Sequence, residues 1–276
     1  MEYQNLRAES VTKHITRIID TDVYLYLIEG QRKACLIDTG HGIGDNLKKV
    51  VETLTDKPVF VILTHNHEDH IGGSGWFNEV YLNAKDHAGY HELADPEIRF
   101  CRHQNPTFGH YPLSAYAPEL KTPHMLTDGQ EFDLGAITVK TIACSGHTAG
   151  SMIVLIKEEQ VAIYGDAIGR RVCLIHPGLT VSQYLESLRY VQSVCGQIVF
   201  GLRCHNDPVV SPTIVDELAE CCQRILKGTD ARQNIQFKHV DGSLTCCFAA
   251  SAVSGPAQAR IDGKQGNIFY TLDNAV

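Results

Sequence analysis

The sequence lacks any long hydrophobic run, with no stretch of 18 or more consecutive apolar residues. A membrane-spanning helix needs about 20 such residues, so none is expected. The first fifteen residues are polar and mixed in charge, unlike a secretory signal with its apolar core. Basic residues are also scarce, with 24 Lys and Arg against 32 Asp and Glu and a net charge of −8. Because nucleic-acid binding depends on basic side chains, an RNA or DNA partner is disfavoured.

The ten cysteines do not form the compact framework of a disulfide scaffold. They are spread from Cys35 to Cys247 and include two adjacent pairs. At 276 residues the chain is long enough to bury a core without disulfides. We therefore expect free thiols, most of them buried, and a reducing compartment, which indicates a cytoplasmic protein.

Apolar patterning predicts strands interspersed with helices. Strands are expected over residues 23–28, 34–37, 59–63, 137–142, 152–156, 161–164 and 198–200, and a few more over 234–276. Helices are expected over 47–54 and 182–195, and a third from Ser211 as N-cap to Gly228 at its end. This order indicates a layered α/β fold in a single domain over residues 1–276.

The fourteen histidines gather in a few short stretches. The densest is Thr64-His65-Asn66-His67-Glu68-Asp69-His70, directly after a predicted buried strand. Imidazole and carboxylate are natural zinc ligands, and four of them within six positions at a strand end can converge on one point. Three further candidates, each in the turn after a predicted strand, are His147, Asp166 and His205. The pattern therefore predicts a metal site.

His65-x-His67-x-Asp69-His70, followed by His147, Asp166 and His205, resembles the metallo-β-lactamase superfamily over about residues 23–225. The resemblance implies an αββα four-layer sandwich with two divalent metal ions. It implies that one metal is held by His65, His67 and His147 and the other by Asp69, His70 and His205, with Asp166 bridging the two. Zinc is the expected metal, with iron or manganese as alternatives.

The residues at two of these positions indicate which branch of the superfamily the chain resembles. With a bridging aspartate, the chain is similar to the glyoxalase II, lactonase and RNase Z branch. True β-lactamases commonly have cysteine at the position of Asp166, and diiron relatives have Glu at the position of His67. Cys204 stands where the family usually has Gly before its last histidine, so His176 and His239 stay open as substitutes for His205.

The same resemblance implies a supporting role for Asp38, which follows the strand over 34–37. In the family this aspartate lies behind the metal site and steadies a ligand, as partners of metal-bound histidines commonly do. The alternative is a turn aspartate that only caps backbone N–H groups. Both interpretations stay open at this point.

The resemblance implies a metal-dependent hydrolase with Asp69 and Asp166 as catalytic carboxylates. A hydroxide bridging the two metals would attack a small ester, thioester or lactone. The alternatives are a phosphodiesterase of the same fold, an iron-dependent oxidation enzyme, and a non-catalytic protein stabilised by metal. A small-molecule substrate is expected, and a homo-oligomer is compatible with the sequence.

The segment 85–125 differs from its surroundings because it is rich in His, Tyr and Pro and lacks apolar periodicity. We expect one or two short helices there and a cap over the active site, with His110, Tyr111 and Tyr116 as candidate substrate contacts. Arg170, in the loop after Asp166, is a candidate partner for an anionic group. Packing or solvent-exposed roles are the alternatives for these four residues.

Overall fold

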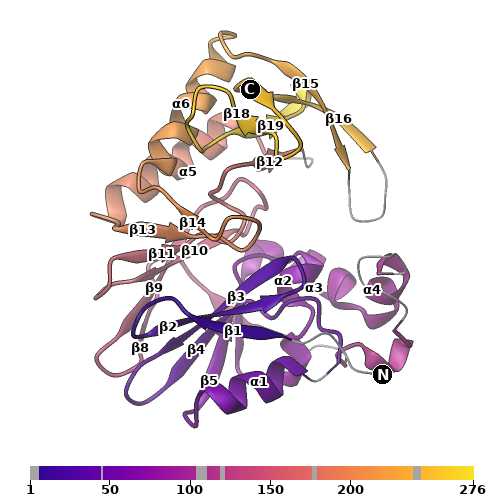
Figure 1. The fold of residues 1–276 in the computed structure, drawn as a ribbon, viewed down its shortest axis with the longest axis vertical. Coiled ribbons are helices and arrows are strands. Elements are labelled where there is room, and N and C mark those ends of the chain that lie inside the picture. Colours follow the sequence, from indigo (N-terminus) through magenta and orange to yellow (C-terminus); the bar gives the residue numbers. More distant parts are fainter. Residues whose placement is uncertain (1–5, 45, 104–110, 119–121, 176–178, 239–243) are drawn as a thin grey trace. The chain divides into compact units, whose positions relative to one another are not determined.

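A computed structural model describes residues 6–44, 46–103, 111–118, 122–175, 179–238 and 244–276 (Figure 1). The chain divides into two compact units. Unit 1 comprises Met1–Thr141, Ile156–Glu158 and Cys204–Asn206, and unit 2 comprises Ile142–Leu155, Glu159–Arg203 and Asp207–Val276.

Unit 1 is built on a seven-stranded sheet whose strands follow their order in the chain. They are β1 (Arg7–Ser10), β2 (Ile15–Asp20), β3 (Val23–Glu29), β4 (Ala34–Ile37), β5 (Val59–Ile62), β6 (Val80–Asn83) and β7 (His124–Leu126). Strands β1 to β4 pair antiparallel, whereas β4 to β7 pair parallel. The central strands β4 and β5 are short, apolar and largely buried, as parallel strands covered on both faces should be.

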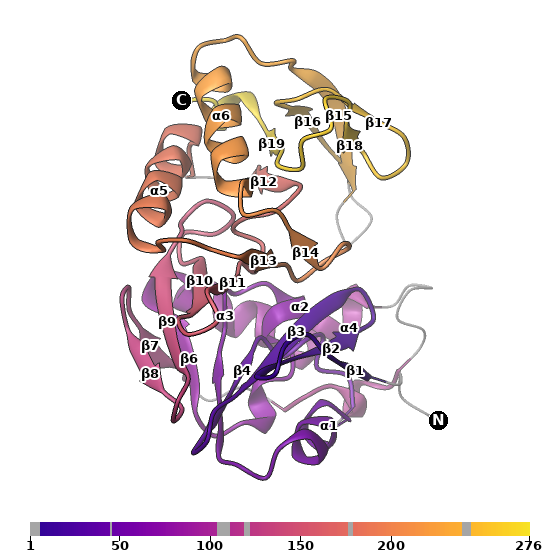
Figure 2. The same cartoon turned by 60° about the vertical axis from the view of Figure 1, so that its left-hand side comes forward.

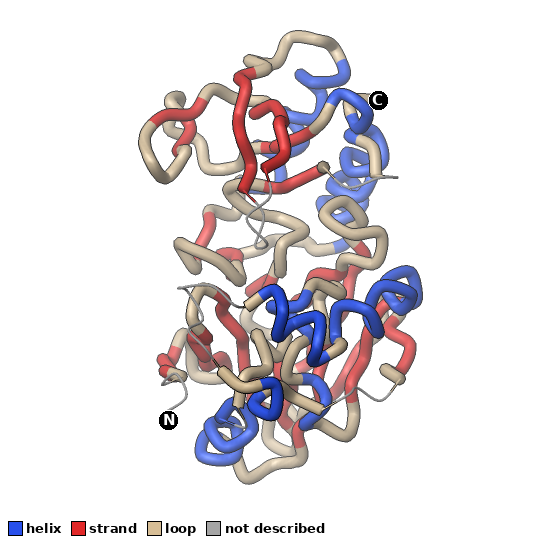
Figure 3. The backbone as a smooth tube through the Cα atoms, turned by 90° about the vertical axis from the view of Figure 1, so that its right-hand side faces the viewer, coloured by secondary structure: helices blue, strands red, loops and turns tan. Residues whose placement is uncertain are grey.

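Short helices connect the parallel strands of unit 1, and Figure 3 shows several of them in front of the strands. They are α1 (Asn46–Leu54), α2 (Glu68–Ile71), α3 (His87–Ala94) and α4 (Pro96–Arg102), with 3-10 turns η1 (Ser74–Trp76), η2 (Ala84–Asp86) and η3 (Leu113–Ala115). Helices α3 and α4 confirm the short helices expected within 85–125. This segment is the connection between the paired strands β6 and β7. Asp95 begins α4 by accepting the backbone N–H groups of Glu97 and Ile98, with Pro96 in its first turn.

Unit 2 contains β10 (Met152–Ile156), β11 (Val161–Ile163), β13 (Phe200–Leu202) and β14 (Val209–Val210), in the order β14-β13-β11-β10. Strand β9 (Thr138–Ala143) begins in unit 1, where it pairs with β8 (Glu131–Asp133). A second sheet has the order β12-β19-β16-β15, made of β12 (Val172–Leu174), β19 (Ile268–Tyr270), β16 (Leu244–Ala249) and β15 (Gln233–Lys238). A two-stranded sheet pairs β17 (Val253–Ser254) with β18 (Ala259–Arg260), and η4 (Leu272–Asn274) follows β19.

Two long helices of unit 2, α5 (Val181–Val194) and α6 (Ile214–Leu226), lie side by side in Figures 1 and 2. Their buried faces share one hydrophobic core, to which α5 contributes Leu185 and Leu188 and α6 contributes Leu218 and Ile225. These residues follow the spacing of an amphipathic helix, and their burial supplies most of the stability of such helices.

Several strands, among them β1, β2, β6 and β12, are not predicted from the sequence, and two expected elements begin at other residues. Helix α6 begins at Ile214 with Thr213 as its N-cap, not at Ser211. The Ser211 hydroxyl accepts the backbone N–H of Thr213 instead, so Ser211 caps the turn that precedes the helix. Strand β13 covers Phe200–Leu202 and not 198–200, because its partner β11 pairs Val161 with Phe200.

The mixture of helices and sheets confirms the α/β class, and the cysteines confirm the expected free thiols. All ten cysteines are among the described residues and are free, and seven of them are buried. None of the helices in the described ranges is long and apolar enough to cross a membrane.

Candidate metal centre

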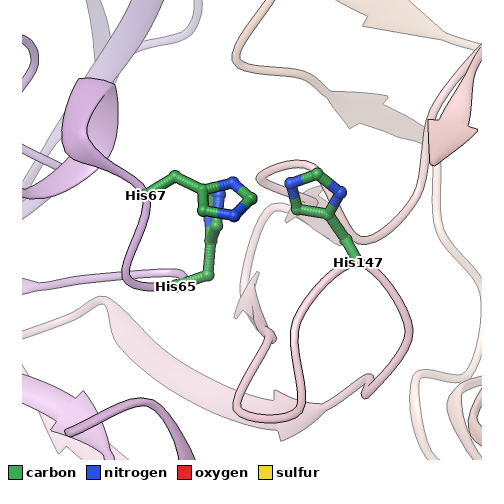
Figure 4. Close-up of side chains that lie close together, drawn as sticks. All are labelled: His65, His67 and His147. Atoms are coloured by element: carbon green, nitrogen blue, oxygen red, sulfur yellow. The ribbon is translucent and has the colours of Figure 1, made fainter. Parts of the chain in front are cut away.

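The loop after β5 carries four of the candidate ligands, all of them in unit 1. Figure 4 shows the rings of His65 and His67 on this loop, with centroids 4.7 Å apart. The ring of His70, one turn into α2, lies 4.1 Å from that of His65. A buried strand followed at once by a tight helical turn thus gathers these imidazoles. The third side chain labelled in Figure 4, His147, belongs to unit 2.

His205 joins Asp69 and His70 to form a group in which three ligand atoms lie within 4.8 Å of one another. Its Nε2 atom is 3.1 Å from the Asp69 carboxylate and 3.3 Å from Nε2 of His70. His205 reaches this place because its backbone bridges to Val23 at the start of β3. We call Asp69, His70 and His205 the half-site. Its donor set of two imidazoles and one carboxylate fits a zinc-like divalent metal.

Asp38 lies behind the half-site and orients two of the imidazoles. Its carboxylate accepts a hydrogen bond from Nδ1 of His70 at 2.8 Å and another from the Thr64 hydroxyl at 2.8 Å. Since the Thr64 hydroxyl donates its proton to Asp38, it accepts from Nδ1 of His65, 3.0 Å away. Both histidines are thereby left with Nε2 as the ligand atom, as metal-bound histidines require. Asp38 also accepts the backbone N–H of Thr64, so it caps a turn as well as touching His70.

The charges in the half-site suit a bound cation. Burial alone would raise the pKa of Asp69, but His70 and His205 hold it well below its ordinary value. Burial alone would lower the pKa of His70, but Asp69 and Asp38 raise it well above its ordinary value. Asp69 is therefore ionised at neutral pH, while His70 retains a proton that a metal ion would replace.

In unit 2, His147 and Asp166 lie close together, with Nε2 and Oδ2 3.7 Å apart. His147 is in the loop after β9, and Asp166 is in the loop after β11. The buried Tyr184 of α5 supports both loops. Its hydroxyl donates to the carbonyl of Ala167 at 2.7 Å, and its ring lies so close to Gly146 that a Cβ there would be 2.2 Å away. Gly146 therefore permits the close approach of the His147 loop to α5.

The candidate substrate contacts have different environments. Tyr111 lines a pocket of unit 1 together with Asp20 and Trp76. Tyr116 is buried, and its ring stacks on His103 with centroids 5.7 Å apart, which favours a packing role over a substrate contact. Arg170 forms an ion pair with Asp207 at 2.9 Å in unit 2. His110, as well as His176 and His239, lies outside the described residues.

Several residues that support the site are not predicted from the sequence. The Asp22 carbonyl contacts His205, and Tyr184 supports the loops of His147 and Asp166. Asp22 also binds the buried His41, whose carbonyl accepts a hydrogen bond from Arg99 of α4. Of these residues, only His41 could have been identified as a candidate from the sequence, because it lies in a glycine-rich loop directly after a buried strand. The others carry no local pattern that sets them apart from ordinary core or turn residues.

The chain is similar to several known proteins. A family model described as the metallo-beta-lactamase superfamily matches residues 19–194. The lactamase-like protein ptaB of Pestalotiopsis fici is 27% identical over 201 residues, which cover 70% of this chain and 54% of that protein. An atrochrysone carboxyl ACP thioesterase of Aspergillus fumigatus is 27% identical over 173 residues, which cover 61% of this chain and 34% of that protein.

Among solved structures, a beta-lactamase domain protein from Burkholderia ambifaria matches with a TM-score of 0.58 and 20% identity. The match covers 80% of this chain and 74% of that chain. These two curated relatives are longer proteins, and the matches span 54% of the first and 34% of the second.

Proposed function

This chain belongs to the metallo-β-lactamase superfamily, and we propose on that basis that it is a metal-dependent hydrolase that cleaves a small thioester, ester or lactone. The likeness to the solved structure confirms the expected fold class. The observation that carries the proposal is the half-site, where Asp69, His70 and His205 place three ligand atoms within 4.8 Å of one another.

The chain's own residues explain how such a site would work. A divalent metal held there would activate water as a nucleophile near neutral pH. Asp38 keeps Nδ1 of His70 protonated, so the Nε2 atom of His70 is the one that would bind the metal. Asp69, ionised at neutral pH because of its histidine neighbours, would offset the charge of the cation.

The full set of ligands that the family resemblance implies is His65, His67, Asp69, His70, His147, Asp166 and His205. We propose that they hold two zinc ions, with Asp69 and Asp166 as catalytic carboxylates. We also propose that the segment 85–125 caps the active site and that Arg170 contacts an anionic group of the substrate. A cytoplasmic location agrees with the free thiols.

A thioester is the favoured bond because one relative is named as an ACP thioesterase. The metallo-β-lactamase fold supports many reactions, so the substrate class needs a direct test. The metal-loaded protein should be assayed against acyl thioesters, lactones and phosphodiesters, with metal content measured on the same sample. Thioester cleavage is expected to be fastest. Turnover of phosphodiesters alone would favour the phosphodiesterase alternative, and dioxygen consumption with bound iron would favour the oxidation enzyme.

Substitution of Asp166 tests the proposed role of this carboxylate. Asp166→Ala is expected to lower hydrolysis by at least 100-fold and to reduce the zinc bound per chain, because it removes a metal-binding oxygen. The control is Asp216→Ala, which removes an exposed aspartate on α6 in the same unit. Full activity and full zinc content in the Asp166 variant would contradict the proposed role.

A further inference from the structure

The turn between β2 and β3 adopts a conformation that its sequence does not favour. Asp20 pairs with Val23 across the hairpin, so Thr21 and Asp22 form the turn. Thr21 is β-branched and has a φ of +57°, in the left-handed region that such residues rarely enter. Backbone strain of this kind persists where the surrounding contacts determine the conformation, and it is found often at functional sites.

The backbone of this turn contacts the half-site directly. The carbonyl of Asp22 accepts a hydrogen bond from Nδ1 of His205 at 2.8 Å, although the two residues are 183 positions apart in the chain. Because a carbonyl can only accept, Nδ1 carries the proton and Nε2 faces Asp69. Asn206, next to His205, has a φ of +58°. Both partners of this hydrogen bond are therefore next to unusual backbone conformations.

The side chain of Asp22 forms a second link, to the buried His41. Its carboxylate is 2.8 Å from Nε2 of His41, whose side chain is only 5% exposed. The backbone N–H of His41 donates to the carboxylate of Asp20 at 3.0 Å. The turn thus holds His41 by both its ring and its backbone.

His41 is in turn fixed by the connection between β6 and β7. The fully buried guanidinium of Arg99 donates to the carbonyl of His41 at 3.1 Å and to that of Ala117 at 3.0 Å. The His41 ring also packs edge-on against His103, with centroids 5.3 Å apart. His41 therefore cannot move without disturbing several buried contacts.

We propose that the Asp22–His41 pair positions His205 by holding the Asp22 carbonyl where it orients the His205 ring. This inference rests on the proposed function, in which His205 is a metal ligand. Asp22 itself has a side chain that is 60% exposed, so it contributes little to the core. Its hydrogen bond to a buried histidine is explained better by placement of the turn than by packing. Asp22 and His41 are positioning residues that do not touch the metal.

The test measures zinc affinity by competition with a chromophoric chelator, together with the absorption spectrum of the cobalt-substituted protein. Asp22→Ala and His41→Phe should each weaken zinc binding at the half-site by about 10- to 100-fold, as loss of a ligand's outer partner does. They should also change the cobalt spectrum. The double variant should lose no more than either single variant, because both act through one link. Asp22→Asn retains an oxygen that can accept the hydrogen bond from His41, so this variant should keep most of the zinc affinity of the wild type.

Two controls separate positioning from general damage. His14→Phe removes another histidine of unit 1 whose ring binds a backbone carbonyl, that of Glu29, and it should leave zinc affinity unchanged. The unfolding midpoint of the metal-free Asp22→Ala variant should stay close to that of the wild type, because the Asp22 side chain is largely exposed. A lowered midpoint with unchanged zinc affinity and cobalt spectrum would overturn the inference.

His205→Ala distinguishes failure of this inference from failure of the proposed function. If His205→Ala weakens zinc binding while Asp22→Ala and His41→Phe match the wild type, the positioning role is wrong and the proposed function stands. If the losses of zinc affinity in Asp22→Ala and His41→Phe add up in the double variant, the two residues do not act through one link and the inference is also wrong. If His205→Ala itself leaves zinc binding unchanged, both the ligand role and the inference are wrong.

Discussion

At the scale of single residues, His103 at the end of α4 has an unusual environment. It is fully buried between the rings of His41 and Tyr116. Burial, together with the charges of His41 and Arg99, lowers its pKa to about 3. The folded protein therefore keeps His103 neutral at pH values where an exposed histidine is protonated.

His103 should make the protein sensitive to acid. Between the unfolded pKa of about 6.5 and the folded pKa of about 3, the unfolded chain binds one more proton at this position. The free energy of unfolding should therefore fall by about 1.4 kcal/mol for each pH unit lost in this window. His103→Phe keeps a ring but removes this slope, as denaturant titrations at several pH values would show. His91→Phe, an exposed position on α3, is the control, and parallel curves for wild type and His103→Phe would contradict the expectation.

At the scale of elements, α5 contacts both loops that carry the candidate ligands of unit 2. The Tyr184 hydroxyl binds the carbonyl of Ala167, and its ring packs against Gly146. Helix α5 itself begins with a reciprocal cap, in which the Thr180 side chain accepts the backbone N–H of Gln183 and the Gln183 side chain binds the backbone N–H of Thr180. A firmly capped helix thus provides a rigid base for two loops.

Removal of the Tyr184 hydroxyl should cost stability because it leaves a buried carbonyl without its partner. Tyr184→Phe is expected to lower the free energy of unfolding by about 1–2 kcal/mol, measured by denaturant titration. Tyr164→Phe is a matched control in the same unit, since the buried Tyr164 hydroxyl has no hydrogen-bond partner among the described residues. Tyr164→Phe should leave stability unchanged or slightly higher. Equal losses in the two variants would show that the Ala167 contact contributes nothing.

At the scale of the whole molecule, metal binding and folding should be coupled. The half-site exists only when α2 and the segment after β13 come together. A metal that binds only the folded chain stabilises it, by about 2.7 kcal/mol when its free concentration is one hundred times its dissociation constant. Zinc should therefore raise the unfolding temperature, and a chelator should lower it again. His205→Ala should show a smaller increase, and identical melting curves with and without zinc would contradict the coupling.

The sequence alone determined the features that depend on neighbouring residues. A short apolar run followed at once by His65, His67, Asp69 and His70 predicts a buried strand that ends in a ligand-rich loop, and the structure has that loop after β5. Side-chain periodicity is a local property, so the strands and helices that it predicted lie within a few residues of observed ones, whereas strands such as β1, β2 and β6 were not predicted. The family resemblance then supplied the fold class.

Only the tertiary structure decided which distant groups support those ligands. Asp38 touches His70 from 32 positions away, Asp22 binds His41 from 19 positions away, and Asp22 meets His205 across 183 positions. No local pattern identifies such partners, because a turn aspartate or a core tyrosine looks the same in sequence whether it supports a site or not. Hydrogen bonds between distant residues form only when folding brings the two residues together, and that arrangement is a property of the whole fold.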